Sequence, residues 1–414
     1  MSVCVTGMGA LSILGKSLSA HAQVLFSPTQ NGEKVALAYA PRVDRLSQTP
    51  PDLRMIEIED EIAHFQQLLN CPLSRNGVLA LCAFEESLVS AQLDISELQG
   101  KKIAFILGTT AGCSGTDTQY IEDFVMDRSP DPSSFRVMLR QNPAEVLRKY
   151  CVARGVSASF ELMLVNNACT SATDALGLAS KLLETEDYDF AFAGGTDEIL
   201  FQTYYGFASL QLLSSHFRSS PFDKNRDGLL LTEGAAILCL EKAEKFNKRR
   251  LGAKAFGEII GYESVTETFH QTSSSPEAEG LTEATRKLLG KAQFSSSDID
   301  FISAHATGTP NNDATEGAFF LKNFPNTKIT ATKGYTGHCL GAVGALEVIF
   351  CMLSFAEKKL PATLGFVEAD PSIGIVPVKE VTPFVPFKKV PIALSTSVGF
   401  GGVNSILLLR GVAE

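Results

Sequence analysis

The sequence predicts an α/β protein made of two related halves, and three observations lead to this prediction. Short apolar runs of strand length alternate with longer stretches in which apolar residues recur at helical spacing. The 414 residues are 45% hydrophobic, which supports a large core. The second half of the chain also repeats the order of elements in the first. We therefore expect sheets covered by helices, with residues 1–250 and 251–414 as the two halves.

The N-terminal half begins with an apolar segment over 3–6, which predicts a strand, and continues into a turn over the glycines at 7 and 9. These glycines do not match the dinucleotide-binding fingerprint GxGxxG. Residues 27–55 are polar and contain prolines, which predicts a loop. The later segments comprise two helical patterns, at 78–93 and 135–150, and four strand-like runs, at 102–108, 160–165, 190–195 and 235–240.

The C-terminal half contains segments that match these elements in the same order. Cys339 is followed six and seven residues later by an Ala-Leu pair, and Cys169 is followed by the same pair at the same distance. Two strand-like runs also have counterparts, 299–304 with 103–107 and 405–409 with 236–240. A duplicated α/β unit explains this order, although chance similarity between Gly/Ala-rich helices is the alternative.

Charge and composition exclude several classes of protein. A net charge of −10 argues against nucleic-acid binding, and the densest basic run, 245–250, is expected only to solvate a helix end. No apolar run approaches the ~20 residues that cross a bilayer, and no signal peptide precedes the first strand. Nine cysteines without CxxC pairs indicate neither a disulfide framework nor a zinc site. We expect a cytoplasmic protein.

Cys169 is the first candidate for chemistry. It follows the strand-like run 160–165 and precedes apolar and small residues at helical spacing, so we expect it at a sharp strand-to-helix turn. Free amide donors and the positive end of the macrodipole at a helix N-terminus favour a thiolate. A buried structural cysteine is the alternative.

Three later motifs favour the catalytic interpretation: residues 304–316 (AHATGTPNNDATE), 332–338 (TKGYTGH) and 397–404 (SVGFGGVN). Together with Cys169 they resemble the beta-ketoacyl-acyl-carrier-protein synthases, and among these the type II condensing enzymes of fatty-acid synthesis. The resemblance extends over nearly the whole chain and is weakest between about residues 30 and 70. It implies a thiolase-like fold, in which duplicated α/β halves form a layered αβαβα core.

The resemblance also implies the reaction. A thiolate attacks thioesters and leaves easily, which suits Cys169 to accept an acyl group. Decarboxylation of a malonyl group then needs donors for the enolate oxygen, and two neutral imidazoles, His305 and His338, can supply them without added charge. Lys333 matches a lysine that orders the site in this family, and Asp313 and Glu316 are its expected acidic anchors. A surface ion pair is the alternative for Lys333.

The remaining matches concern substrate binding. Thr307 and Thr309 correspond to hydroxyls that hold the phosphopantetheine arm in the family, with turn or capping roles as the alternative. The resemblance makes Phe400 a gate beside the cysteine, its amide and that of Cys169 forming an oxyanion hole. Gly399 and Gly401 flank this ring and permit unusual backbone angles, so they are expected to line the substrate path. An ordinary turn with a buried Phe is the alternative.

Some residues depart from the family pattern. Ala306 stands where the family usually has Gly, Val398 stands where a second Phe is usual, and the loop 110–115 matches only loosely. These differences leave the preferred acyl chain and the carrier open.

The sequence therefore predicts a decarboxylating condensing enzyme that extends an acyl thioester with malonyl-acyl carrier protein. It needs no metal and no diffusible cofactor, because the carrier protein brings the phosphopantetheine arm. The expected partners are an acyl carrier protein and a second copy of the chain. The alternatives are a ketosynthase of a polyketide or aryl polyene pathway, a chain-length-factor-like subunit, and a Cys-His hydrolase. The expected docking site for the acidic carrier consists of Arg128, Arg136, Arg140, Arg148 and Lys149, with solvation of a helix as the alternative role of these residues.

Overall fold

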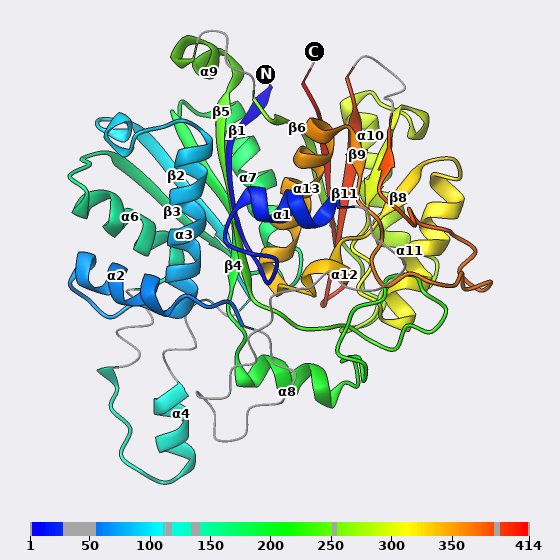
Figure 1. Cartoon of the computed structure of the whole chain (residues 1–414), viewed down its shortest axis with the longest axis horizontal. Helices are drawn as coiled ribbons and strands as arrows, with labels where there is room; N and C mark the ends of the chain where they lie inside the picture. Colours follow the sequence, from blue (N-terminus) through cyan, green and yellow to red (C-terminus); the bar gives the residue numbers. More distant parts are fainter. Residues whose placement is uncertain are drawn as a thin grey trace.

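The computed structural model describes residues 2–27, 55–110, 112, 118–133, 141–250, 255–384 and 390–412. Ten strands within these residues form one mixed sheet in the order β3-β2-β4-β5-β1-β6-β12-β11-β7-β8 (Figure 1). Their bounds are β1 (Val3–Leu11), β2 (Lys102–Gly108), β3 (Ser159–Val165), β4 (Phe190–Asp197), β5 (Gly234–Lys242), β6 (Gly257–Thr266), β7 (Phe301–Ser303), β8 (Lys328–Thr330), β11 (Ile392–Gly399) and β12 (Val403–Arg410). The short strands β9 (Lys359–Leu360) and β10 (Thr382–Pro383) pair separately.

The strand order is symmetric about the junction of β1 and β6. Moving outward, β1, β5, β4, β2 and β3 lie on one side, and β6, β12, β11, β7 and β8 lie on the other. This places β7 opposite β2 and β12 opposite β5, which are the correspondences that the sequence predicted. Every strand on the first side precedes residue 250, and every strand on the second side follows it.

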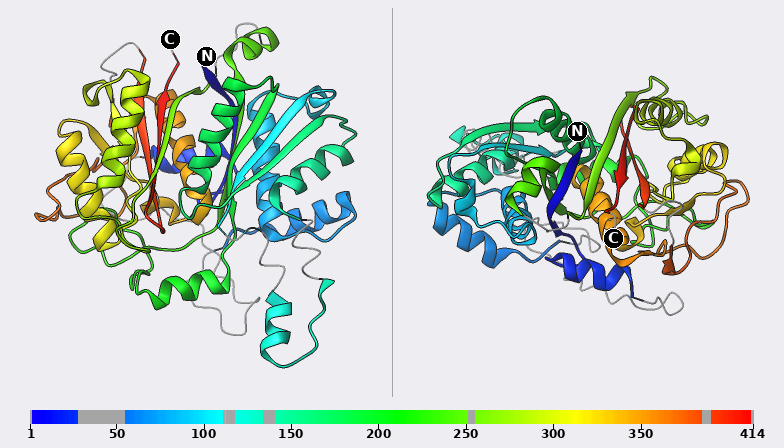
Figure 2. Two further views of the ribbon diagram at one scale, coloured as in Figure 1. Left: turned by 180° about the vertical axis from the view of Figure 1, so that it is seen from behind. Right: turned by 90° about the horizontal axis from the view of Figure 1, so that it is seen from above.

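The two sides of the sheet form two β layers, and helices pack between them and outside them (Figures 1 and 2). The resulting five layers confirm the predicted αβαβα arrangement. Helices α7 and α13 share one core with strands of both sides, so they form the central layer. The outer layers are formed by α3 and α6 on one side and by α10 and α11 on the other. The helix bounds are α1 (Leu18–Leu25), α2 (Glu59–Leu69), α3 (Arg75–Ser90), α4 (Thr118–Val125), α6 (Pro143–Ala153), α7 (Ser171–Thr185), α8 (Phe201–Ser209), α9 (Ala243–Arg249), α10 (Glu279–Ala292), α11 (Pro310–Asn323), α12 (Lys333–Thr336) and α13 (Val343–Glu357).

The predicted turn at Gly7 and Gly9 is wrong, because both residues lie inside β1. A Cβ atom at Gly9 would lie 2.0 Å from the carbonyl oxygen of Ala83, and one at Gly7 would lie 2.3 Å from that of Ser87. The glycines therefore allow the backbone of α3 to pack directly on β1. Two earlier predictions lie largely outside the described residues: the predicted loop at 27–55, except for its two end residues, and residues 135–140 of the predicted helix at 135–150.

Helix α13 also differs from expectation. The window Leu340–Glu357 is long and apolar enough to cross a membrane by length and composition, although the sequence analysis expected no such segment. In the structure 89% of this window is buried inside the protein, between strands of the two sides. Its apolar character on all faces is therefore that of a core helix.

Candidate active site

Cys169 lies at the turn between β3 and α7, as predicted. Strand β3 ends at Val165, and α7 begins at Ser171 with Thr170 as its N-cap residue. Ala168 has a φ of 50°, a left-handed conformation that alanine rarely adopts. This sharp turn leaves Cys169 at the N-terminal end of the helix, with only 7% of its surface exposed.

The surroundings of Cys169 act on its thiol in opposite directions. Burial raises the pKa of the thiol to about 12, and the positive charge of Lys333 is the largest opposing influence. Burial thus opposes the thiolate that the helix N-terminus is predicted to favour.

A cavity of about 300 Å³ opens above Cys169. It contains both predicted histidines, both predicted threonines, Gly399 and Phe400, so the structure brings these residues together. Among the described residues, no Lys, Arg, Asp or Glu lines it. Its lining residues are Cys169, Phe207, Leu210, Gln211, Leu212, Leu229, Thr272, Ser273, Ser274, His305, Thr307, Thr309, Pro310, Asn311, Asn312, His338, Val398, Gly399 and Phe400.

The two histidines face the sulfur of Cys169. One ring nitrogen of each and the Sγ atom all lie within 4.8 Å of one another. The ring centres of His305 and His338 are 5.3 Å apart, and the two ring planes meet at an angle of 83°. Burial, followed by the positive charge of Lys333, lowers the pKa of each imidazole well below its usual value. Both rings are therefore neutral at physiological pH.

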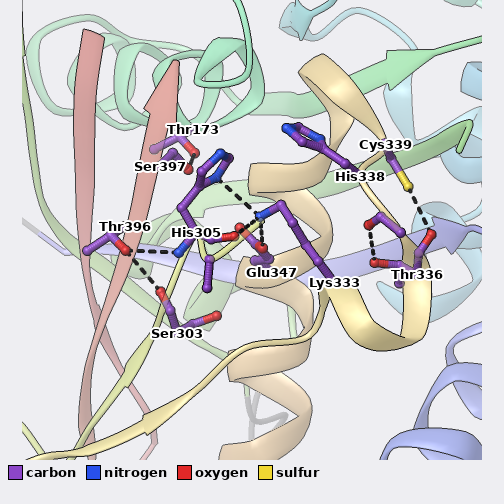
Figure 3. Close-up of polar contacts among 12 residues, drawn as sticks. Thr173, Ser303, His305, Lys333, Thr336, His338, Cys339, Glu347, Thr396 and Ser397 are labelled. Atoms are coloured by element: carbon purple, nitrogen blue, oxygen red, sulfur yellow. Dashed lines mark hydrogen bonds and ion pairs between the residues drawn. The ribbon is translucent and has the colours of Figure 1, made fainter. Parts of the chain in front are cut away.

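Hydrogen bonds fix the tautomer of each ring. The Leu340 amide donates to His338 Nδ1 at 3.0 Å. The Lys333 ammonium lies 3.1 Å from His305 Nδ1, as Figure 3 shows. An ammonium group can only donate, so Nδ1 accepts in both rings and Nε2 carries the proton. The site thus presents two neutral N–H donors beside a thiol.

This arrangement does not suit a metal centre, although one thiol and two imidazoles could otherwise form one. Metal-bound histidines almost always donate their other ring N–H to a carboxylate or carbonyl oxygen. Here Nδ1 of His305 and of His338 faces a donor instead. Binding a metal through Nε2 would require both rings to change tautomer and lose these bonds.

Lys333 is completely buried, and its partner is Glu347 rather than the predicted Asp313 and Glu316. The ammonium lies 2.6 Å from Glu347 Oε1 and also donates to the backbone carbonyl of His305 (Figure 3). Burial raises the pKa of Glu347 to about 7, and Lys333 opposes this shift. Because Glu347 is on α13, this ion pair links Lys333 to the central layer.

Asp313 and Glu316 hold the histidine loop by its backbone. Glu316 accepts from the amides of His305 at 3.0 Å and Ala306 at 2.6 Å, and Asp313 accepts from the amide of Gly308 at 3.1 Å. Both carboxyl groups are fully buried, and burial raises the pKa of Glu316 to about 7. The sequence identified these residues but assigned them the wrong contacts. Ala306 has a φ of 26°, which explains why glycine is usual there.

The residues predicted to bind substrate line the cavity, with the exception of Gly401. Thr307 and Thr309 are buried in the cavity wall with their hydroxyls 2.9 Å apart. Phe400 projects from the three-residue turn between β11 and β12 and stacks on Phe207, with 5.4 Å between ring centres. Gly401 has a φ of 85° and donates its amide to the carbonyl of Gln271, so it shapes the turn but does not line the cavity.

Comparison with known proteins identifies the family. The beta-ketoacyl synthase N-terminal domain matches residues 1–245, and the beta-ketoacyl synthase C-terminal domain matches residues 256–367. The chain belongs to the beta-ketoacyl synthase family. This confirms the resemblance inferred from the motifs.

Curated relatives of this beta-ketoacyl synthase include the 3-oxoacyl-[acyl-carrier-protein] synthase 2 of Staphylococcus aureus (strain COL). The two are 29% identical over 99% of this chain and 98% of the relative. The protein of the same name from Synechocystis sp. (strain ATCC 27184 / PCC 6803 / Kazusa) is 30% identical over 99% of this chain and 97% of its own. The similarity thus extends over whole chains.

Solved structures show the same architecture. The ishigamide ketosynthase/chain length factor has a TM-score of 0.79 and 25% identity, covering 100% of this chain and 99% of that one. The structure of the ketosynthase ApeO in complex with its chain length factor ApeC, from Xenorhabdus doucetiae, has a TM-score of 0.77 and 26% identity, covering 100% and 98%. A beta-ketoacyl synthase from Burkholderia phymatum STM815 shares the fold at 23% identity and a TM-score of 0.80, covering 99% of each chain.

Sequence reasoning missed two residues of this synthase site. Glu347 is the only acidic residue between Val343 and Phe355, within an otherwise apolar helix, and a buried carboxylate in such a helix requires a partner. That pattern could have identified it as the partner of Lys333. Phe207 lies on α8, and nothing in its local sequence distinguishes it from the other aromatic residues of this helix.

Proposed function

We propose that this beta-ketoacyl synthase catalyses the decarboxylative condensation of an acyl thioester with malonyl-acyl carrier protein in fatty acid elongation. One observation supports this best: a cysteine thiol and two neutral imidazole N–H donors meet in one cavity. Acyl transfer needs the thiol, and decarboxylation needs donors that can stabilise an enolate oxygen without a net charge.

In the first half-reaction Cys169 attacks the acyl thioester. The Sγ–acyl bond forms, the bond between the acyl carbon and the carrier sulfur breaks, and the Cys169 proton leaves with the carrier thiol. The amides of Cys169 and Phe400 are the proposed donors to the tetrahedral oxyanion. Because burial raises the pKa of the Cys169 thiol, this scheme has the thiol lose its proton as it attacks.

In the second half-reaction a malonyl-carrier thioester enters. Its C–C bond to the carboxylate breaks, carbon dioxide leaves, and the electron pair passes onto the thioester oxygen, where the Nε2–H groups of His305 and His338 donate. The resulting carbanion attacks the acyl-cysteine, forms the new C–C bond and releases the Cys169 thiolate, which takes up one proton. The product is a carrier-bound 3-oxoacyl chain two carbons longer.

The cofactor and carrier follow from this scheme. We propose that the phosphopantetheine arm arrives on an acyl carrier protein, with Thr307 and Thr309 along its path, and that no other cofactor takes part. A solved structure with the same fold is that of a type II polyketide acyl-carrier protein in complex with its ketosynthase, at 22% identity and a TM-score of 0.78. The described lining of the cavity contributes no charged side chain, so contacts with an acidic carrier must come from outside it.

Two of the proposed docking arginines already have partners. Arg128 lies 3.3 Å from Asp123, and Arg148 binds Glu145 through two hydrogen bonds. Arg136 and Arg140 lie outside the described residues. Both described arginines are therefore paired within their own chain, so a carrier that docks here must compete with Asp123 and Glu145 for them.

We further propose a cytoplasmic homodimer that associates through β3. This strand is an edge of the sheet, and its side chains are only partly covered; 41% of Leu164 is exposed. An exposed apolar edge strand normally requires a covering partner. A second copy can supply this by antiparallel pairing of its own β3.

The second candidate is a ketosynthase of a specialised polyketide or aryl polyene pathway. Two solved structures of ketosynthases with chain length factors are 25% and 26% identical in sequence to this chain, which supports this candidate. The test incubates the purified protein with acyl- and malonyl-carrier thioesters and analyses enzyme and carrier by mass spectrometry. The expected result is an acylated Cys169 peptide and a 3-oxoacyl carrier. A protein that forms neither contradicts the proposal, and products extended by several ketide units indicate the specialised pathway.

A further inference from the structure

Asp174 is a buried carboxylate that neither the motifs nor the proposed mechanism uses. It lies in the first turn of α7, five residues after Cys169, and only 3% of its surface is exposed. We propose that Asp174 is a positioning residue, which fixes the turn carrying the nucleophile against the half of the protein that carries the histidines. This inference rests on the proposed condensation.

Each oxygen of Asp174 faces a different half. Oδ2 accepts from Asn167 Nδ2 at 2.6 Å and from Thr170 Oγ1 at 2.8 Å, the residues two before and one after Cys169. Oδ1 accepts from Tyr262 OH on β6 at 3.0 Å and from Ser405 Oγ on β12 at 2.5 Å. Four donors thus lie within hydrogen-bond distance of one carboxylate, two from the nucleophile turn and two from the second side of the sheet, although the Thr170 hydroxyl proton is shared with the carbonyl of Asn167 at 2.7 Å.

The turn needs such an anchor because its backbone is strained. Ala168 adopts a left-handed conformation with a φ of 50°, which is unfavourable for a residue with a Cβ atom. Strained residues keep their conformation only when neighbouring contacts over-determine it. Asp174 meets this need through side chains on both sides of Cys169, and Ser171 adds a hydrogen bond to the carbonyl of Ala168 at 2.6 Å.

The link to the second half sets the relation between nucleophile and histidines. Cys169 comes from the first half of the chain, whereas His305 and His338 come from the second. A second contact, between Thr173 Oγ1 and Ser397 Oγ at 2.7 Å, joins α7 to β11 near the Phe400 turn (Figure 3). Asp174 is the group that binds both the cysteine turn and strands of the second half, so it can set the distance from the thiol to the two imidazoles.

Asp174→Asn tests this role because the amide keeps the size of the side chain but offers one acceptor oxygen in place of two. We expect acylation of Cys169 to slow by about 100-fold, the scale on which a displacement of about 1 Å affects an oriented reaction. The KM for the acyl thioester should stay within about twofold, because the cavity is unchanged. Uncoupled decarboxylation of malonyl-carrier, which relies on the histidines, should change by less than about threefold.

Tyr262→Phe is the milder variant and removes one donor to Oδ1. Acylation should slow by about fivefold, the rate equivalent of one ordinary hydrogen bond. Glu241→Gln is the matched control, since Glu241 on β5 is also a buried carboxylate that lies outside the cavity lining. It accepts hydrogen bonds from Thr6 on β1 and Arg249 on α9. This control should leave both rates unchanged at a temperature where the protein is folded, even if its melting temperature falls.

Two results would overturn the inference. Equal losses of acylation and decarboxylation in Asp174→Asn would mean that the residue supports the fold in general. Acylation within twofold of the parent in both Asp174→Asn and Tyr262→Phe would mean that the turn holds its position without Asp174. Failure of the proposed function is distinguishable from both, because the parent protein would then show neither acylation nor decarboxylation.

Discussion

The turn at Cys169 and the turn at Cys339 lead into the two helices of the central layer, α7 and α13, in the two halves of the protein. The first turn directly follows the edge strand β3, whereas α12 separates the edge strand β8 from Cys339. Both turns contain positive φ angles: Ala168 before Cys169 has a φ of 50°, and around Cys339 Gly337 has a φ of 68° and Leu340 one of 50°. Two cysteines thus occupy related positions.

Their surroundings differ. Cys169 faces the cavity and two imidazoles, whereas Cys339 is fully buried, with its sulfur 3.1 Å from Thr232 Oγ1 and 3.9 Å from the carbonyl of Thr336 (Figure 3). Burial raises the pKa of both thiols to about 12. The raised pKa therefore does not distinguish the proposed nucleophile, Cys169, from Cys339; access to the cavity and the neighbouring donors do. The second turn instead contributes His338, the residue next to Cys339.

The largest effect on activity should come from replacing Cys169 with alanine, and replacing Cys339 is the matching comparison. Cys169→Ala should abolish acyl-enzyme formation and condensation, because no other thiol of the described residues lines the cavity. Cys339→Ala should retain activity within about twofold, since its sulfur only packs and hydrogen-bonds. Mass spectrometry of the acylated protein checks both. Persistent acylation in Cys169→Ala would remove the distinction between the turns.

The next effect should come from the histidines. His305→Ala and His338→Ala should each lower malonyl decarboxylation by about 100-fold or more, because each removes a preorganised donor. Cys169 should still become acylated, at least slowly. Carbon dioxide release from malonyl-carrier measures this step. Decarboxylation at the parent rate in both variants would show that other groups stabilise the enolate.

Breaking the ion pair between Lys333 and Glu347 should affect the reaction rate less than the histidine variants do, but it should clearly lower the stability of the protein. Glu347→Gln leaves the buried Lys333 charge without a counter-ion, which we expect to lower the unfolding free energy by about 3–5 kcal/mol. Urea denaturation measures this change. Lys287→Gln is the control, because Lys287 is paired with Glu283 at the surface and should change stability by less than about 1 kcal/mol. Equal stability of the two variants would contradict the assigned role of Glu347.

The smallest effect concerns pH. Because the pKa of Cys169 is raised to about 12, its thiolate fraction increases tenfold with each pH unit between pH 7 and 9, and alkylation by iodoacetamide should accelerate in proportion. Cys339 should stay unmodified over this range, since it does not line the cavity. Peptide mass spectrometry distinguishes the two sites. A rate that is already constant above pH 7 would show that the thiolate is the resting form.

The sequence predicted much of this molecule because its signals were local. Strand-like runs, the helix after Cys169 and the glycine-bracketed histidine motifs each depend on residues close together in the chain. Contacts between distant residues were harder to predict. Lys333 could have paired with any nearby acid, and only the packing of α13 selects Glu347. The raised pKa of Cys169 likewise depends on burial by both halves, which no local pattern reports.

The two glycines of β1 were misjudged for a related reason. Glycine in a short apolar run usually indicates a turn, but here Gly7 and Gly9 make room for α3, which begins at Arg75. That requirement comes from a neighbour more than seventy residues away in sequence. Asp174 also escaped notice, because its role depends on Tyr262 and Ser405, which reach it only in the folded protein.

The central position of β1 has a consequence for biosynthesis. This strand pairs with β5 on one side and β6 on the other, so it joins the two sides of the sheet. Strand β5 begins at Gly234, so about 220 residues must be translated after β1 before its first neighbour emerges, which takes about 10–45 s at ~5–20 residues per second. During this time an apolar segment remains without its hydrogen-bonding partners on the ribosome. Nascent chains of this protein are therefore expected to depend on chaperones until β6 has been made.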